Sequence, residues 1–235
     1  MTFRTKTAMV GTIAALVLPA AGQAATSQFR ATLEELNGSS VSGTVDFFVD
    51  DVARQLRVVA NIEGLEPNAL HVNHIHGRFE DDGSPRNSVT PTMAADTDGD
   101  GFVEVLEGLP GYGDILLSLE PDPTPESNHV FPFATAEGTV DYELIYDLDD
   151  SGPIFSTVTG TDYDPEDLFP LELREYVIHG LTVPGGVNPD LPNGGYLATL
   201  PVAAAEISPV PVPAAGFLLM GALGGLGLMR RRARG

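Results

Sequence analysis

The alternation of apolar and polar positions along the chain predicts β-strands separated by turns, with no long helical repeat. The clearest strand covers residues 56–62, where Leu56, Val58, Ala60 and Ile62 fall on one face. The 26 glycines and 19 prolines fit frequent turns. The pattern therefore predicts an all-β sandwich with long loops, in one domain over residues 25–208. Further strands are expected at residues 27–36, 41–49, 71–77, 138–146, 173–180 and 196–207, with a short strand or a helical turn at 114–119.

The two ends of the chain have the character of export signals rather than of folded structure. Residues 1–24 join Arg4 and Lys6 to an apolar run and end in small residues, as a secretory signal peptide does. Residues 209–235 contain a proline-rich motif, an apolar segment to Met229 and a cluster of arginines from Arg230. The apolar segment is at the short limit for a membrane helix, and the arginines behind it would hold that end in the cytoplasm. We therefore expect the body of the protein to face outward from the inner membrane.

The body of the chain is strongly acidic. The formal charge of the whole chain is −21, from 12 basic and 33 acidic residues. Six of the basic residues lie in the two terminal segments, which carry no acidic residue, so six basic and 33 acidic residues remain and the body has a formal charge of −27. Such a surface repels nucleic acid, and no nucleic-acid partner is expected. Because there is no cysteine, any metal must be held by nitrogen and oxygen ligands.

Three of the five histidines lie within six residues, at His71, His74 and His76. In a strand, His74 and His76 point to the same face, and two such imidazoles can share a metal ion. The alternative is that these rings act as hydrogen-bonding spacers. Two ligands do not complete a site, so the interpretation depends on ligands from elsewhere in the chain.

Ahead of His71, His74 and His76 the chain has a spaced series of glycine and apolar residues, namely Gly43, Phe47, Leu56, Val58, Ile62, Gly64 and Leu65. This order resembles the first half of copper/zinc superoxide dismutases and of the related chordin-type (CHRD) domains. The resemblance resumes near the end of the chain at residues 173–180, which end in His179 and Gly180. It implies a Greek-key β-sandwich or barrel. It also implies that His74, His76 and His179 are copper ligands and that His71 is structural.

The sequence also departs from the dismutase pattern. It has no cysteine for the usual disulfide, and residues 194–199 lack the arginine expected there. In place of the histidine-rich zinc loop there is only His129, which either completes the metal set or caps a loop. Since the acidic body would repel superoxide, we expect the fold without the activity.

Residues 96–107 match the twelve-residue calcium loop of EF-hands. Oxygen donors stand at positions 1, 3, 5, 9 and 12, a glycine stands at position 6, and a backbone carbonyl is available at position 7. Prolines on both sides exclude long flanking helices, and an acidic solvated turn is the alternative. The loop lies in a divergent insertion, about residues 78–137, and calcium is expected to staple it. The predicted calcium ligands are Asp96, Asp98, Asp100, Phe102, Glu104 and Glu107.

The C-terminal segment resembles bacterial sorting signals of the PEP-CTERM type, in their VPLPA variant. The motif consists of Val210, Pro211, Val212, Pro213 and Ala214. The resemblance implies a Gram-negative protein that is anchored in the inner membrane by its C-terminal helix. An exosortase-type enzyme would then process it for the cell surface or the extracellular space. An uncleaved tail anchor is the alternative.

Two functions follow as hypotheses. The first is an exported CHRD-like domain that acts in binding or in envelope or matrix structure, with calcium in its loop and copper or zinc on its histidines. The second is a copper-dependent metalloenzyme of the dismutase type. A variant of the first has zinc bracing the sandwich without redox activity.

Overall fold

The computed structural model describes residues 26–121, 130–149, 154–155 and 159–211. The predicted signal peptide, His129, most of the sorting motif and the predicted C-terminal helix lie outside these residues. The strands are β1 (Thr26–Thr32), β2 (Glu34–Glu35), β3 (Ser42–Asp50), β4 (Gln55–Glu63), β5 (Asn73–Phe79), β6 (Pro85–Arg86), β7 (Asp114–Ser118), β8 (Val140–Asp147), β9 (Ile154–Phe155), β10 (Asp162–Tyr163), β11 (Glu175–Pro184), β12 (Gly194–Glu206) and β13 (Ser208–Pro209). The helices are η1 (Met93–Ala95), α1 (Val105–Tyr112), η2 (Pro165–Leu168) and η3 (Leu171–Leu173).

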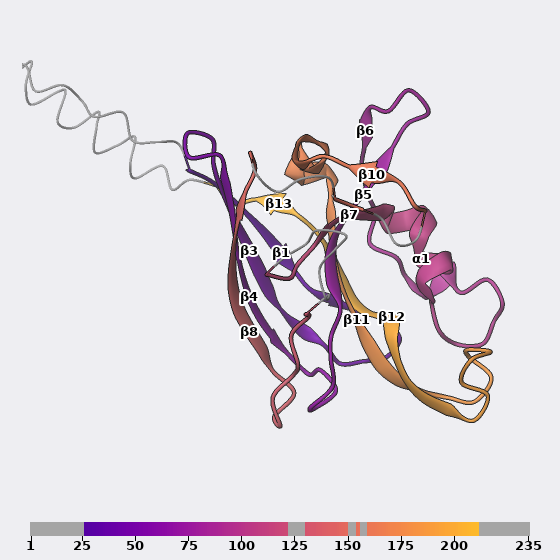
Figure 1. Cartoon of the computed structure of the whole chain (residues 1–235). Helices are drawn as coiled ribbons and strands as arrows, with labels where there is room; N and C mark the ends of the chain where they lie inside the picture. Colours follow the sequence, from indigo (N-terminus) through magenta and orange to yellow (C-terminus); the bar gives the residue numbers. More distant parts are fainter. Residues whose placement is uncertain (1–25, 122–129, 150–153, 156–158, 212–235) are drawn as a thin grey trace, which may run out of the picture.

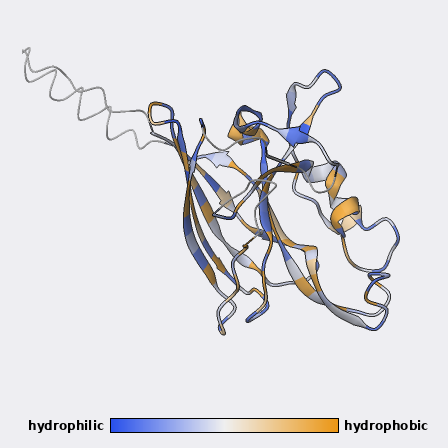
Figure 2. Ribbon diagram, in the orientation of Figure 1, coloured by the Kyte–Doolittle hydropathy of each residue, from blue (hydrophilic) through white to orange (hydrophobic). Residues whose placement is uncertain are grey.

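Two antiparallel sheets form a β-sandwich, which confirms the predicted all-β class (Figure 1). In the described part of the chain one sheet has the order β13-β1-β3-β4-β8. The other has the order β2-β12-β11-β5-β6, with β7 also paired to β5. The strand that the alternation marked most clearly, residues 56–62, is the body of β4. Figure 2 shows hydrophobic and hydrophilic residues alternating along the long strands, as a sheet with one buried face requires.

The main core lies between the two sheets. Phe47 and Val58 from the first sheet and Ile75, Tyr176 and Ile178 from the second are each fully buried in it. Within β5 and β11, alternate residues turn away from this core toward the outer face of the second sheet. The two strands that carry the histidines are therefore anchored by one face and can present side chains on the other.

A smaller core covers the outer face of the second sheet. There Tyr112 at the end of α1 and Val103 pack on Val177 and Ala204. Figure 1 shows α1 outside the layer formed by β11 and β12, on the side away from β3 and β4. The divergent insertion therefore covers the face of the second sheet that carries the histidines.

Residues 27–36 do not form the single strand that we predicted. The chain passes from β1 in the first sheet to β2 in the second, and buried Leu33 lies at the crossing. Ala31 and Leu33 are both buried in the main core, so the apolar alternation of β1 runs into the crossing and does not mark its start. At the other end, β13 pairs with β1, and the N–H of Val210 donates to the carbonyl of Gln28. The sheet thus continues past residue 208, where we had placed the domain boundary.

Candidate metal centre

His74, His76 and His179 come together on the outer face of the second sheet. β5 and β11 are antiparallel neighbours in which His74 pairs with Val177, two residues before His179. Since residues two apart in a strand share a face, the register brings the three imidazoles to one place. One ring nitrogen from each lies within 4.8 Å of the others, and the ring centroids are 5.3–6.0 Å apart. The spacing is that of three ligands around one ion.

Backbone carbonyls fix the orientation of two of these rings. Nδ1 of His76 lies 2.9 Å from the carbonyl oxygen of Gly113, and Nδ1 of His179 lies 2.7 Å from that of Thr199. A carbonyl only accepts, so each Nδ1 carries the proton and donates it, which leaves a lone pair on Nε2. Both Nε2 atoms are buried and have no hydrogen-bond partner among the described residues. A metal ion is the group that such a pair of buried lone pairs fits.

The burial of the site keeps the imidazoles of His76 and His179 neutral. His74, His76 and His179 are 6%, 1% and 3% exposed. Desolvation lowers the pKa of His76 to about 4. Desolvation, with repulsion from His76, lowers the pKa of His179 to about 3. At pH 7 both rings are thus in the form that binds copper, zinc, nickel or iron.

Aromatic rings surround the three histidines. The Tyr112 ring lies 4.6 Å from that of His76, and the Phe131 ring lies 5.6 Å from that of His74. The Tyr112 hydroxyl donates to the carbonyl of Val105, so it is held by its own helix and not directed at the histidines. These walls make the site dry, and a dry site strengthens the interaction of an ion with its ligands.

The other two histidines have different positions. His71 lies beside the set, with Nδ1 2.9 Å from the carbonyl oxygen of His179 and Nε2 3.1 Å from that of Glu66. Both ring nitrogens thus lie against backbone carbonyl oxygens, and His71 is not part of the group of histidines whose nitrogens converge. His129 falls outside the described residues. In residues 194–199, where the resemblance would place an arginine, the Tyr196 hydroxyl donates to the carbonyl of Leu70.

The predicted calcium loop gathers its acidic side chains into two groups. Ligand oxygens of Asp96, Asp98 and Glu107 lie within 4.8 Å of one another, and so do those of Asp98, Asp100 and Glu104. Desolvation and a hydrogen bond with Glu107 raise the pKa of Glu104 to about 8. Hydrogen bonds from Thr97 and Glu104 lower the pKa of Glu107 to about 2. Carboxylates this close repel one another, and a divalent cation would relieve that repulsion.

The acidic loop is joined to the histidines through α1. This helix starts at Val105, position 10 of the loop, and ends at Tyr112 against His76. As expected, it is short, but Pro110 lies inside it rather than ending it. The backbone N–H of Glu104 donates to Glu107 Oε2 at 3.2 Å, which closes the first turn.

Sequence reasoning did not find the groups that orient the rings. Gly113 and Thr199 act through backbone carbonyls, which carry no side-chain signal. Gly113 is the exception in one respect, because its backbone φ of +87° favours glycine and the sequence does show a glycine there. An alanine Cβ there would lie 2.1 Å from the carbonyl oxygen of Gly77. The helix can therefore approach β5 only through a glycine.

A search of protein-family models finds none that matches the chain, and a search of curated proteins finds no match either. Among the described residues, no helix is both long enough and apolar enough to cross a membrane. The predicted sorting motif falls partly within the described residues, which end with Val210 and Pro211.

Proposed function

We propose that this protein is an exported CHRD-like β-sandwich that holds one transition metal ion on His74, His76 and His179. In this proposal the domain acts in binding or in the structure of the envelope or matrix. The metal is copper or zinc, and calcium staples the loop at residues 96–107. Processing by an exosortase-type enzyme at the C-terminal signal would release the domain from the inner membrane to the cell surface of a Gram-negative bacterium.

One observation carries the proposal, namely the pair of buried Nε2 atoms on His76 and His179 that have no hydrogen-bond partner among the described residues. Leaving a buried polar atom unpaired costs about 1–3 kcal/mol. Two such atoms, with a nitrogen of His74 within 4.8 Å, are hard to explain as spacers because spacers exist to make hydrogen bonds. Coordination of a metal ion by these atoms would explain why they are buried without hydrogen bonds.

A redox enzyme of the dismutase type is the second candidate. Three nitrogen ligands leave a coordination position for a small substrate, which favours it. The charge of −27 on the body opposes it, because superoxide is an anion and would be repelled. The burial of all three histidines to 6% exposure or less also favours holding a metal over turning over a substrate.

Metal titration of chelator-stripped protein tests the proposal. Isothermal titration with Cu²⁺ and Zn²⁺ is expected to give one site per chain, and His76→Ala is expected to lose it. His71→Gln is the matched control, since it also alters a buried histidine but none of the three ligands. His71→Gln is expected to keep one site per chain and to melt at a lower temperature. Equal binding by wild type and His76→Ala would overturn the proposal.

The two functions differ in one further assay. If the protein is a dismutase, the copper-loaded form removes superoxide faster than His76→Ala does. We expect the two rates to be equal. The His129→Ala variant tests whether that residue adds a fourth ligand, as a fall in affinity without loss of the site.

A further inference from the structure

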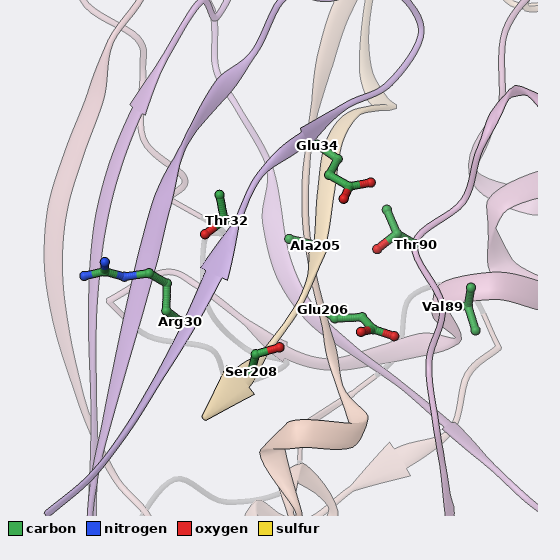
Figure 3. A pocket seen from close by; sticks show the side chains of 8 residues that line it. All are labelled: Arg30, Thr32, Glu34, Val89, Thr90, Ala205, Glu206 and Ser208. Atoms are coloured by element: carbon green, nitrogen blue, oxygen red, sulfur yellow. The ribbon is translucent and has the colours of Figure 1, made fainter. Parts of the chain in front are cut away.

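A separate pocket of about 380 Å³ opens where the end of β12 meets residues 89–90 of the insertion (Figure 3). Its walls include Glu34, Thr90 and Glu206, and none of the three histidines or the loop carboxylates lines it. Figure 3 shows the carboxylates of Glu34 and Glu206 and the hydroxyl of Thr90 on one side of the pocket, turned toward the same space.

The sheet register gathers carboxyl groups behind this pocket. Glu206 pairs directly with Glu175, and Glu34 pairs with Ala204 in the next row of the same face. The one basic residue in the pocket wall, Arg30, makes two bonds of 2.8 Å to Asp46, and its guanidinium points away from the carboxylates in Figure 3. It therefore leaves the charge of the glutamates uncompensated.

The buried side chain of Glu175 points to a missing partner. The residue is 0% exposed, and one carboxylate oxygen accepts a hydrogen bond of 2.5 Å from the Thr90 hydroxyl in the pocket wall. The other oxygen, Oε2, is buried and has no hydrogen-bond partner among the described residues. An unpaired buried polar oxygen is rare in a native protein, and a bound water, ion or ligand is one explanation for it.

We propose that this pocket binds a guanidinium group. The group is carried either by a free small amine or by the arginine side chain of a partner. The glutamates are too far apart for a compact metal site, because the groups of ligand atoms that converge within 4.8 Å in the described chain do not include them. A planar guanidinium carries five donors and can bridge separated carboxylates with paired bonds. The hydroxyls of Thr32, Thr90 and Ser208 in the wall supply further acceptors.

Calorimetric titration with agmatine, at 150 mM salt, tests this site in the purified protein. Wild type and Glu137→Gln are expected to bind it equally, since Glu137 is an exposed carboxylate outside the pocket. Glu206→Gln and Glu34→Gln remove the same charge and are expected to weaken binding at least tenfold. Glu175→Gln keeps the shape of the side chain and is expected to weaken binding several-fold. An equal loss in Glu137→Gln would mean that the acidic surface attracts any cation, and would overturn the proposal.

Three further ligands define the chemistry. Cadaverine has a similar length without the guanidinium, and we expect it to bind more weakly; equal affinity would refute guanidinium recognition. Calcium at 1 mM is expected to leave the agmatine affinity unchanged, and competition by calcium would show a metal site instead. A capped Gly-Arg-Gly peptide separates the two sources. Binding of the peptide supports a partner's arginine, binding of agmatine alone supports a free amine, and binding of neither overturns the proposal.

Discussion

Replacing Gly113 by alanine should damage both the fold and the metal site, because this residue is where α1 meets β5. The backbone of Gly113 has φ +87° and ψ −167°, a conformation that side chains rarely adopt and that costs about 1–3 kcal/mol. The added Cβ would also lie 2.1 Å from the oxygen and 2.4 Å from the carbon of the Gly77 carbonyl. Pushing backbone apart in a packed region costs about 1–3 kcal/mol more. We therefore expect a total loss of about 2–6 kcal/mol.

Gly83→Ala is the matched control. Gly83 has a similar φ of +82°, but a Cβ there meets nothing within 4 Å. It should cost only the conformational part, about 1–2 kcal/mol. Urea unfolding followed by circular dichroism measures both losses, and an unchanged m-value shows that the comparison is valid.

The same substitution reports on the metal site. The Gly113 carbonyl accepts the proton from Nδ1 of His76, and moving it releases the ring from its orientation. Losses of such supporting bonds typically weaken metal binding by about 10–100-fold. Gly113→Ala should thus weaken Zn²⁺ binding by that factor and Gly83→Ala should not. If both variants lost equal stability and kept full metal affinity, the role given to Gly113 would be wrong.

Three further perturbations test other parts of the structure. Desolvation raises the pKa of Glu175 to about 8, so the folded state keeps the proton that the unfolded state releases near pH 4.5, and the free energy of unfolding should fall as the pH rises between these values. In urea melts, Glu175→Gln should remove a few kcal/mol of that decline. Parallel curves of stability against pH for the wild type and the variant would refute this. Glu107→Gln should abolish the rise in melting temperature that calcium causes in the wild type. That rise corresponds to about 2.7 kcal/mol of added stability when calcium is at 100 times its Kd. An undiminished rise in the variant would show that calcium binds elsewhere. Asn73→Leu should lower the free energy of unfolding by about 2–4 kcal/mol in urea melts, because Asn73 Oδ1 accepts hydrogen bonds from the hydroxyls of Tyr142 and Tyr176 between the sheets. A loss of less than 1 kcal/mol would contradict this role.

Strand positions could be predicted from the sequence because each long strand has one face in the core. The ends of β3, β4, β8, β11 and β12 all lie within four residues of the predicted ranges, since burial of one face repeats with period two. The crossing at Leu33 was missed because Ala31 and Leu33 are both buried in the main core, so the alternation of β1 runs on into the crossing. His74 and His76 were found from their spacing and His179 from the resemblance to the dismutase pattern. The convergence of the three depends on the register of β5 and β11, which neither determines.

Other features of the site had no signal in local sequence. Glu175 and Glu206 face each other on the consecutive strands β11 and β12, and only the register of these strands, which contains irregularities, reveals that pairing. Arg174 is fully buried, and its guanidinium donates to the carbonyls of Leu168, Asp167 and Arg78. Arginine side chains are usually exposed, so the residue type alone would not have predicted that Arg174 is buried.

The metal content of the purified protein tests the central claim most directly. The secreted body should be isolated without chelators and without a histidine tag, and its metals counted by elemental mass spectrometry beside those of His76→Ala. We expect copper or zinc at close to one ion per chain in the wild type and a loss of that ion in the variant. Calcium alone in the wild type, or the same transition metal in both proteins, would contradict the metal centre on His74, His76 and His179.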